Sequence, residues 1–93
     1  MEVYDKYKEY SDLVKDYKDC NKYLRELDKY NYIVLSNWAE ERYSQWILKD
    51  EKYAFSVTEG TVPPRDERER AVNTLTNFKT TLEKIATING FTL

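Results

Sequence analysis

Apolar residues recur at alternating intervals of four and three over residues 2–29. Their positions are Val3, Tyr7, Tyr10, Val14, Tyr17 and Leu24. In an α-helix, positions spaced in this way lie on one face. Leu13, Cys20 and Leu27 widen that face, and neither glycine nor proline interrupts the segment. The pattern predicts a single long helix over residues 2–29.

Residues 32–58 show a different pattern. The segments 32–35, 43–48 and 53–58 are rich in β-branched and aromatic residues, and the last of them alternates large and small side chains. Residues of this kind favour β-strands, and the charged segment 49–52 fits a hairpin turn. The pattern predicts a three-stranded antiparallel β-meander over residues 32–58.

A helix is the alternative for the middle of this region. Asn37 has a side chain suited to a helix N-cap, with Glu40 at the third helical position. Ala39, Tyr43 and Trp46 also have helical spacing. Residues 37–48 therefore stay open between strand and helix, and the strand interpretation defines the predicted fold.

Two prolines separate this region from a second helix. Pro63 and Pro64 mark a linker over residues 59–64. The apolar positions that follow at intervals of four and three are Ala71, Leu75, Phe78, Leu82 and Ile85. They predict a helix over residues 65–88, and Gly90 in the tail 89–93 can end it in the left-handed conformation.

These elements predict a single domain over residues 1–93 with an α+β fold. Its order is a long helix, a three-stranded meander and a second long helix (αβββα). The two helices would cover one face of the small sheet.

Composition excludes several classes of function. The chain of 93 residues has 15 basic and 17 acidic side chains, a net charge of −2, no histidine, one cysteine and two glycines. A generally basic nucleic-acid binder is excluded by this charge. Histidine-based catalysis, zinc sites of Cys and His, and glycine-rich phosphate loops are excluded by the residue counts. We therefore expect no enzymatic activity, no cofactor and no metal.

The sequence also carries expectations about location. The N-terminal segment shows no signal-peptide pattern, and its apolar runs are far too short to span a membrane. Cys20 has no second cysteine with which to form an intramolecular disulfide, as is usual in the cytosol. We expect a cytoplasmic protein without a membrane segment.

Charged residues form two ordered rows on the first predicted helix. The acidic row consists of Asp5, Glu9, Asp12, Asp16 and Asp19, which lie almost opposite the apolar positions. Lys8, Lys15, Lys22 and Lys29 recur every seven residues and, with Lys18 and Arg25, line a neighbouring face. Both rows can be solvated surface. The functional alternative is that the acidic row occupies a basic groove on a nucleic-acid enzyme.

A second candidate surface is aromatic. Trp38, Tyr43, Trp46 and Tyr53 would lie around the exposed face of the predicted sheet. Large aromatic side chains are enriched in protein interfaces. This face is the alternative protein-binding surface if the acidic row is only solvated.

Three hypotheses for the function follow. The first is a non-enzymatic protein-binding module that inhibits a nucleic-acid-processing or defence enzyme through its acidic, tyrosine-rich surface. Its small size, low glycine content and high Tyr and Lys content resemble, in general character, small accessory proteins of phages and mobile elements. The second is a structural protein that self-associates, for example as a homodimer, through its heptad-spaced helix faces. The third, direct nucleic-acid binding, is opposed by acidic residues interleaved with the lysines.

Overall fold

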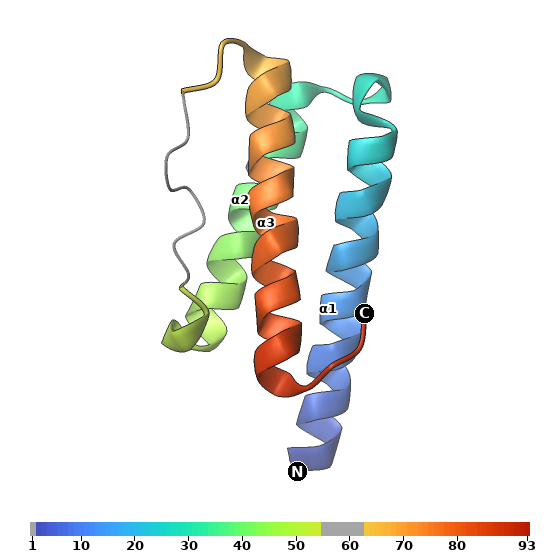
Figure 1. The fold of residues 1–93 in the computed structure, drawn as a ribbon, viewed down its shortest axis with the longest axis vertical. Coiled ribbons are helices and arrows are strands. Elements are labelled where there is room, and N and C mark those ends of the chain that lie inside the picture. Colours follow the sequence, from blue (N-terminus) through green and yellow to red (C-terminus); the bar gives the residue numbers. More distant parts are fainter. Residues whose placement is uncertain (1, 55–62) are drawn as a thin grey trace.

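The computed structural model describes the backbone of residues 2–54 and 63–93, and the side chains of residues 6–54 and 63–93. Every regular element in these ranges is helical (Figure 1). The order is α1 (Glu2–Arg25), the 3₁₀ turn η1 (Leu27–Lys29), α2 (Tyr32–Lys49), the 3₁₀ turn η2 (Glu51–Tyr53) and α3 (Glu67–Asn89).

The predicted β-meander, and with it the α+β fold class, is wrong. Residues 32–49 form the single helix α2, and residues 32–54 contain no strand. The part of the expected third strand from residue 55 onward lies outside the described residues. The helical alternative for residues 37–48 is correct, although the helix begins well before Asn37.

Asn31 caps the start of α2. Its side-chain oxygen accepts hydrogen bonds from the backbone N–H groups of Ile33 (2.9 Å) and Val34 (3.1 Å). These two donors would otherwise have no partner in the first helical turn. The cap thus begins the helix just before the β-branched residues that suggest a strand.

The other two helices agree with the sequence pattern. The predicted helix over residues 2–29 corresponds to α1 followed by η1, and the one over residues 65–88 corresponds to α3. Asp66 caps α3 by accepting a hydrogen bond from the backbone N–H of Glu69 (2.8 Å). At the other end Gly90 is left-handed, with φ of +73°. The N–H of Phe91 then reaches the carbonyl of Ala86 (2.8 Å), which confirms the predicted glycine stop.

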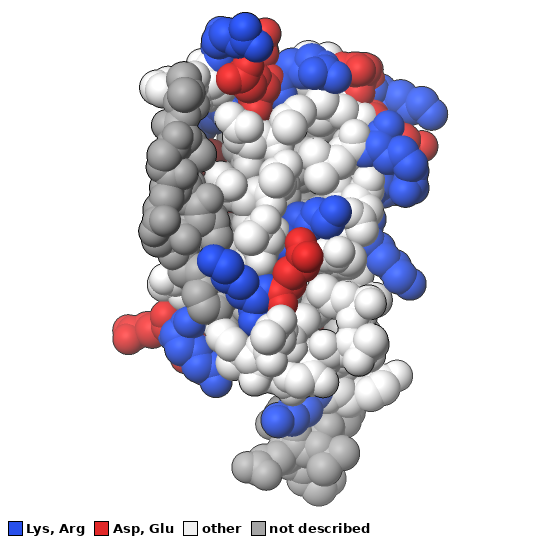
Figure 2. Space-filling view, in the orientation of Figure 1, with Lys and Arg blue, Asp and Glu red and all other residues white. Residues whose placement is uncertain are grey.

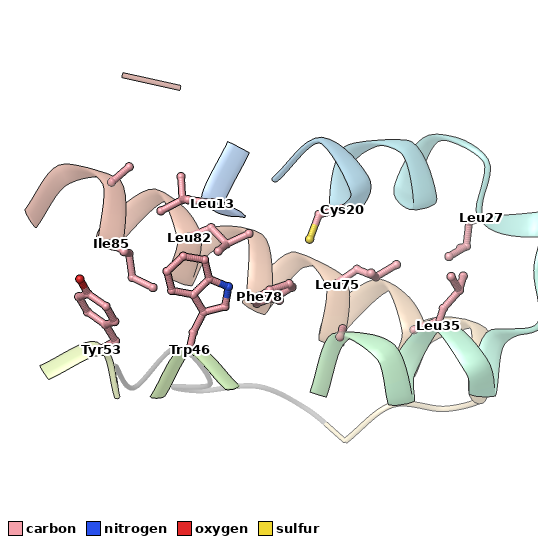
Figure 3. Close-up of a cluster of buried hydrophobic side chains, with 13 residues drawn as sticks. Leu13, Cys20, Leu27, Leu35, Trp46, Tyr53, Leu75, Phe78, Leu82 and Ile85 are labelled. Carbon is pink, nitrogen blue, oxygen red and sulfur yellow. The ribbon is translucent and has the colours of Figure 1, made fainter. Parts of the chain in front are cut away.

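Helix α3 lies against both other helices and carries the centre of the core (Figure 1). Figure 3 shows its Leu75, Phe78, Leu82 and Ile85 between the apolar side chains of α1 and α2. The members that α1, α2 and η2 contribute are Leu13, Cys20, Leu27, Leu35, Ala39, Trp46 and Tyr53. In contrast to this apolar core, polar side chains form much of the contact between α1 and α2.

Candidate protein-binding surface

A polar groove runs between α1 and α2. Two hollows that share Asp12 and Lys49 make up this groove. The candidate residues that line it are Glu9, Asp12, Asp16, Asp19, Trp38 and Tyr53. The structure therefore brings together residues of the acidic row and of the aromatic set, which the sequence places on separate surfaces.

Asp16 is the one buried residue of the acidic row among those whose side chains are described, and it is only 3% exposed. Its Oδ2 accepts hydrogen bonds from the indole N–H of Trp46 (2.8 Å) and from Nη2 (2.8 Å) and Nε (3.2 Å) of Arg42. A buried carboxylate needs such partners to offset the loss of hydration. Asp16 therefore joins α1 to α2 and offers no free surface to a partner.

Asp12 and Glu9 are also held by the chain itself. Asp12 forms an ion pair with Lys49 (3.5 Å), whose ammonium lies 4.0 Å from the centre of the Trp46 ring. Glu9 accepts a hydrogen bond from the hydroxyl of Tyr53 (2.6 Å). That hydroxyl in turn accepts one from Asn89 at the end of α3 (2.9 Å). These contacts tie the acidic row to α2, η2 and α3.

Burial and the acidic row change the pKa values of neighbouring groups. Burial, followed by the nearby charges of Asp16 and Asp19, raises the pKa of the Cys20 thiol to about 12. Burial and then the hydrogen bond to Glu9 raise the pKa of Tyr53 to about 12. Both groups are therefore neutral at physiological pH, and Cys20 lacks the thiolate that a nucleophile requires.

The remaining candidates have less direct roles in the groove. Asp19 is half-buried, and the side chain of Asp5 lies outside the described residues. Trp38 is half-buried and packs edge-on against Tyr23 and Phe78, at ring-centre distances of 5.1 and 5.7 Å. These contacts place Trp38 at the margin of the core.

The predicted aromatic surface on an exposed sheet face is wrong, because these residues lie on helices and pack inward. Trp46 is 0% exposed and Tyr53 is 3% exposed. Trp38 and Tyr43 are half-buried against the core. The aromatic residues therefore stabilise the fold, and only Trp38 and Tyr53 also border the groove.

The basic row lies on the solvent-exposed side of α1, and its members Lys8 and Lys15 also border the groove. We call Lys8, Lys15, Lys18, Lys22 and Arg25 the basic ridge, and all five are exposed. At 1.5 Å per residue the ridge is about 26 Å long. Within the described part of the chain none of the five forms an ion pair. Figure 2 shows blue side chains gathered along the edge of the molecule formed by α1.

Sequence reasoning named both charged rows but assigned the candidate site to the acidic one. The feature that shows which row faces inward is the buried set Leu13, Cys20 and Leu27, spaced by seven residues. These residues lie between the apolar positions and the acidic row on the helix. They shift the buried side of α1 toward the acids and leave the basic row as the outermost side.

No family model, no curated protein and no solved structure matches this chain. None of the described helices combines the length and the apolar character needed to cross a membrane. Groups of three or more residues able to hold a metal ion are also missing from the described ranges.

Proposed function

We propose that this protein is a small non-enzymatic binding module that holds an acidic protein partner along the basic ridge of α1. The observation that carries the proposal is the row of five exposed cations that form no ion pair within the described chain. Such a row raises the rate of encounter with an oppositely charged surface and favours one orientation. A cytoplasmic location, where the lone Cys20 stays reduced, belongs to the same proposal.

The proposal changes the partner expected from the sequence. An enzyme with a basic groove would have to displace Arg42 from Asp16 and Lys49 from Asp12 before it could reach the acidic row. Removing one member of a buried, hydrogen-bonded ion pair is costly. An acidic partner on the ridge displaces nothing. Inhibition of an enzyme remains compatible with this mode of binding if the ridge contacts an acidic region of that enzyme.

Self-association is a second candidate, favoured by a separate observation. Near the start of α1 and the end of α3, three apolar side chains are well exposed: Tyr7 (72%), Ile88 (48%) and Leu93 (46%). Tyr7 lines a hollow together with Tyr10 and Phe91, and contiguous exposed apolar surface is typical of interfaces. Light scattering over a range of concentrations tests this candidate, which predicts a rising apparent mass. A constant monomer mass rejects it.

The test of the proposed function uses fluorescent poly-L-glutamate as an acidic probe. The double variant Lys15→Glu, Lys22→Glu should bind at least about tenfold more weakly than the original chain, and binding should weaken as salt rises. The matched control is Arg65→Glu with Lys84→Glu, which makes the same change of charge just before α3 and on α3. Equal losses in both variants would reject a specific role for the ridge.

Nucleic acid is tested in the same assay. A single-stranded oligonucleotide of the same charge as the polyglutamate should bind no more tightly than polyglutamate does. The carboxylates of Asp12 and Asp19 flank the ridge on the groove side and repel phosphates and carboxylates alike, so phosphates gain no advantage there. Tighter binding of the oligonucleotide, lost in the ridge variant, would replace the proposal with nucleic-acid binding.

A further inference from the structure

A second line of side chains runs beside the basic ridge on the side away from the acidic row. We call Tyr7, Tyr10, Val14, Tyr17, Asn21 and Leu24 the seam; their spacing alternates between three and four residues. The sequence pattern predicts that this line is the buried face of the helix. In the structure Tyr7 is 72% exposed and the other five residues are half-buried. The buried side of α1 is instead centred on Leu13, Cys20 and Leu27.

The seam has the residue pattern of one strand of a coiled coil. A heptad assignment that starts at Tyr7 puts Tyr7, Val14 and Asn21 at the first position and Tyr10, Tyr17 and Leu24 at the fourth. These are the positions that a second helix covers in a coiled coil. A lone asparagine at a first position, such as Asn21, is a known means of fixing register at some cost in stability.

Helix α3 covers the seam only in part. Lys79 of α3 lies over the Tyr17 ring, 5.6 Å from its centre, and the Phe91 ring is 5.1 Å from that of Tyr10. These contacts reach residues at the fourth heptad position. The first-position residues lie farther round the helix, toward Lys18 and Arg25. Figure 2 shows that the face where α1 and α3 lie side by side is largely uncharged.

The charges beside the seam determine what can cover it. Lys18 and Arg25 occupy the fifth heptad position, which in a coiled coil forms ion pairs with the partner helix. A second copy in antiparallel orientation would place these cations against their own counterparts. In parallel orientation they would face Leu13 and Cys20 at the seventh heptad position, which are buried. Neither arrangement supplies acids.

We propose that the seam and the basic ridge together bind an amphipathic α-helix with an acidic flank, contributed by a partner protein. Its apolar residues cover Tyr7 and Val14, which lie at the first heptad position, and its carboxylates pair with Lys18, Lys22 and Arg25. This inference rests on the proposed function, because it names the partner element that the ridge binds. It adds an apolar contact that a general acidic surface does not need.

The test uses two synthetic helical peptides of identical composition. The first has leucines at the first and fourth heptad positions and glutamates along the flanking row. The second has the same glutamates moved to the opposite side of the helix. Fluorescence polarisation should show that the first peptide binds at least about tenfold more tightly, because only it satisfies apolar and charged contacts together. Equal affinities of the two peptides would overturn the inference.

Variants of the chain separate the seam from the ridge. Tyr7→Ser with Val14→Ser should weaken binding of the first peptide about tenfold and leave the binding of polyglutamate unchanged. Lys15→Glu with Lys22→Glu should weaken both. If the seam variant binds the peptide as well as the original chain does, the inference fails while the proposed function stands. If the ridge variant binds both probes normally, the proposed function fails as well.

A gain of affinity provides a check that misfolding cannot imitate. Asn21→Leu replaces the polar side chain at a first heptad position with an apolar one, so it should tighten binding of the first peptide several-fold. Unchanged or weaker binding would contradict a heptad contact at this position. Light scattering completes the test: a stable dimer that the seam variant abolishes would identify a second copy as the occupant and overturn the acidic helix.

Discussion

The acidic row and the basic ridge occupy the same helix with similar spacing, yet only one of them belongs to the interior of the molecule. Asp16 is 3% exposed and holds Arg42 and Trp46, whereas Lys15 and Lys18 are exposed and form no ion pair within the described chain. The difference arises because α2 supplies cationic and indole donors to one side of α1, whereas the side chains of Lys15 and Lys18 on the other side are exposed. Charge patterning shows that a helix has distinct faces, but the neighbouring helices decide which of these faces stays exposed to solvent.

The free energy of unfolding should change most when a buried residue of the acidic row is replaced. Asp16→Ala should lower the free energy of unfolding by about 3 kcal/mol, because Arg42 and the Trp46 indole lose their shared acceptor while partly or fully buried. Urea denaturation measures this loss. The matched control Asp12→Ala removes a carboxylate from a more exposed ion pair and should cost less than about 1 kcal/mol. Equal losses of stability in the two variants would mean that Asp16 contributes no more than Asp12 to the contact between α1 and α2.

Alkaline pH should lower the free energy of unfolding, because the thiol of Cys20 is buried beside the acidic row. The pKa of Cys20 rises from 9.0 in the unfolded chain to about 12 in the fold. Below pH 9 the thiol is protonated in both states, so stability does not depend on it. Above pH 9 only the unfolded state loses the proton, which lowers stability by about 1.4 kcal/mol at pH 10. Urea unfolding measured below pH 9 and at pH 10 shows this decrease. In the Cys20→Ala variant the decrease should be smaller by this amount.

Tyr53→Phe should have a smaller effect on the inward side. The substitution removes the hydroxyl that joins Glu9 to Asn89 but keeps the buried ring. Loss of this link should cost about 1 kcal/mol, since Glu9 can turn toward water while Asn89 keeps its bond to the Ile85 carbonyl. Thermal unfolding with its midpoint unchanged would show that the link contributes nothing to stability.

The free energy of unfolding should change least when residues of the basic ridge are replaced. Lys15→Glu with Lys22→Glu should change the free energy of unfolding by less than about 0.5 kcal/mol, because exposed, unpaired cations contribute little to folding. The measurement is urea denaturation alongside Asp16→Ala. A loss as large as that of Asp16→Ala would place the ridge in a structural contact and remove its role as a free surface.

The sequence predicted α1 and α3, the first and last helices of the chain, because both have long runs of regularly spaced apolar residues. The left-handed stop at Gly90 followed from its position after the last apolar turn. Helix α2 was mistaken for strands because Tyr32, Ile33 and Val34 favour extended structure. The cap at Asn31 and the burial of Ala39 and Trp46 on one helical face outweigh that preference.

The candidate site was predictable only in part. The residues of both charged rows could be named from their spacing, but the side that faces solvent could not. That side depends on Arg42, Trp46 and Lys49, which reach α1 only because residues 32–49 form a helix. If residues 32–58 are strands, no pattern within residues 2–29 shows that Asp16 has partners. The seven-residue spacing of Leu13, Cys20 and Leu27 is the remaining signal, because it widens the apolar face toward the acidic row.

Hydrogen exchange of the Trp46 indole N–H shows directly whether the acidic row of α1 faces α2. This proton is donated to Asp16 Oδ2 (2.8 Å) inside the α1–α2 contact, on a side chain with no exposed surface. NMR should show slow exchange in the original chain and in the Lys15→Glu, Lys22→Glu variant, and markedly faster exchange in Asp16→Ala. Exchange in the original chain as rapid as that of a solvated indole would contradict the inward position of the acidic row.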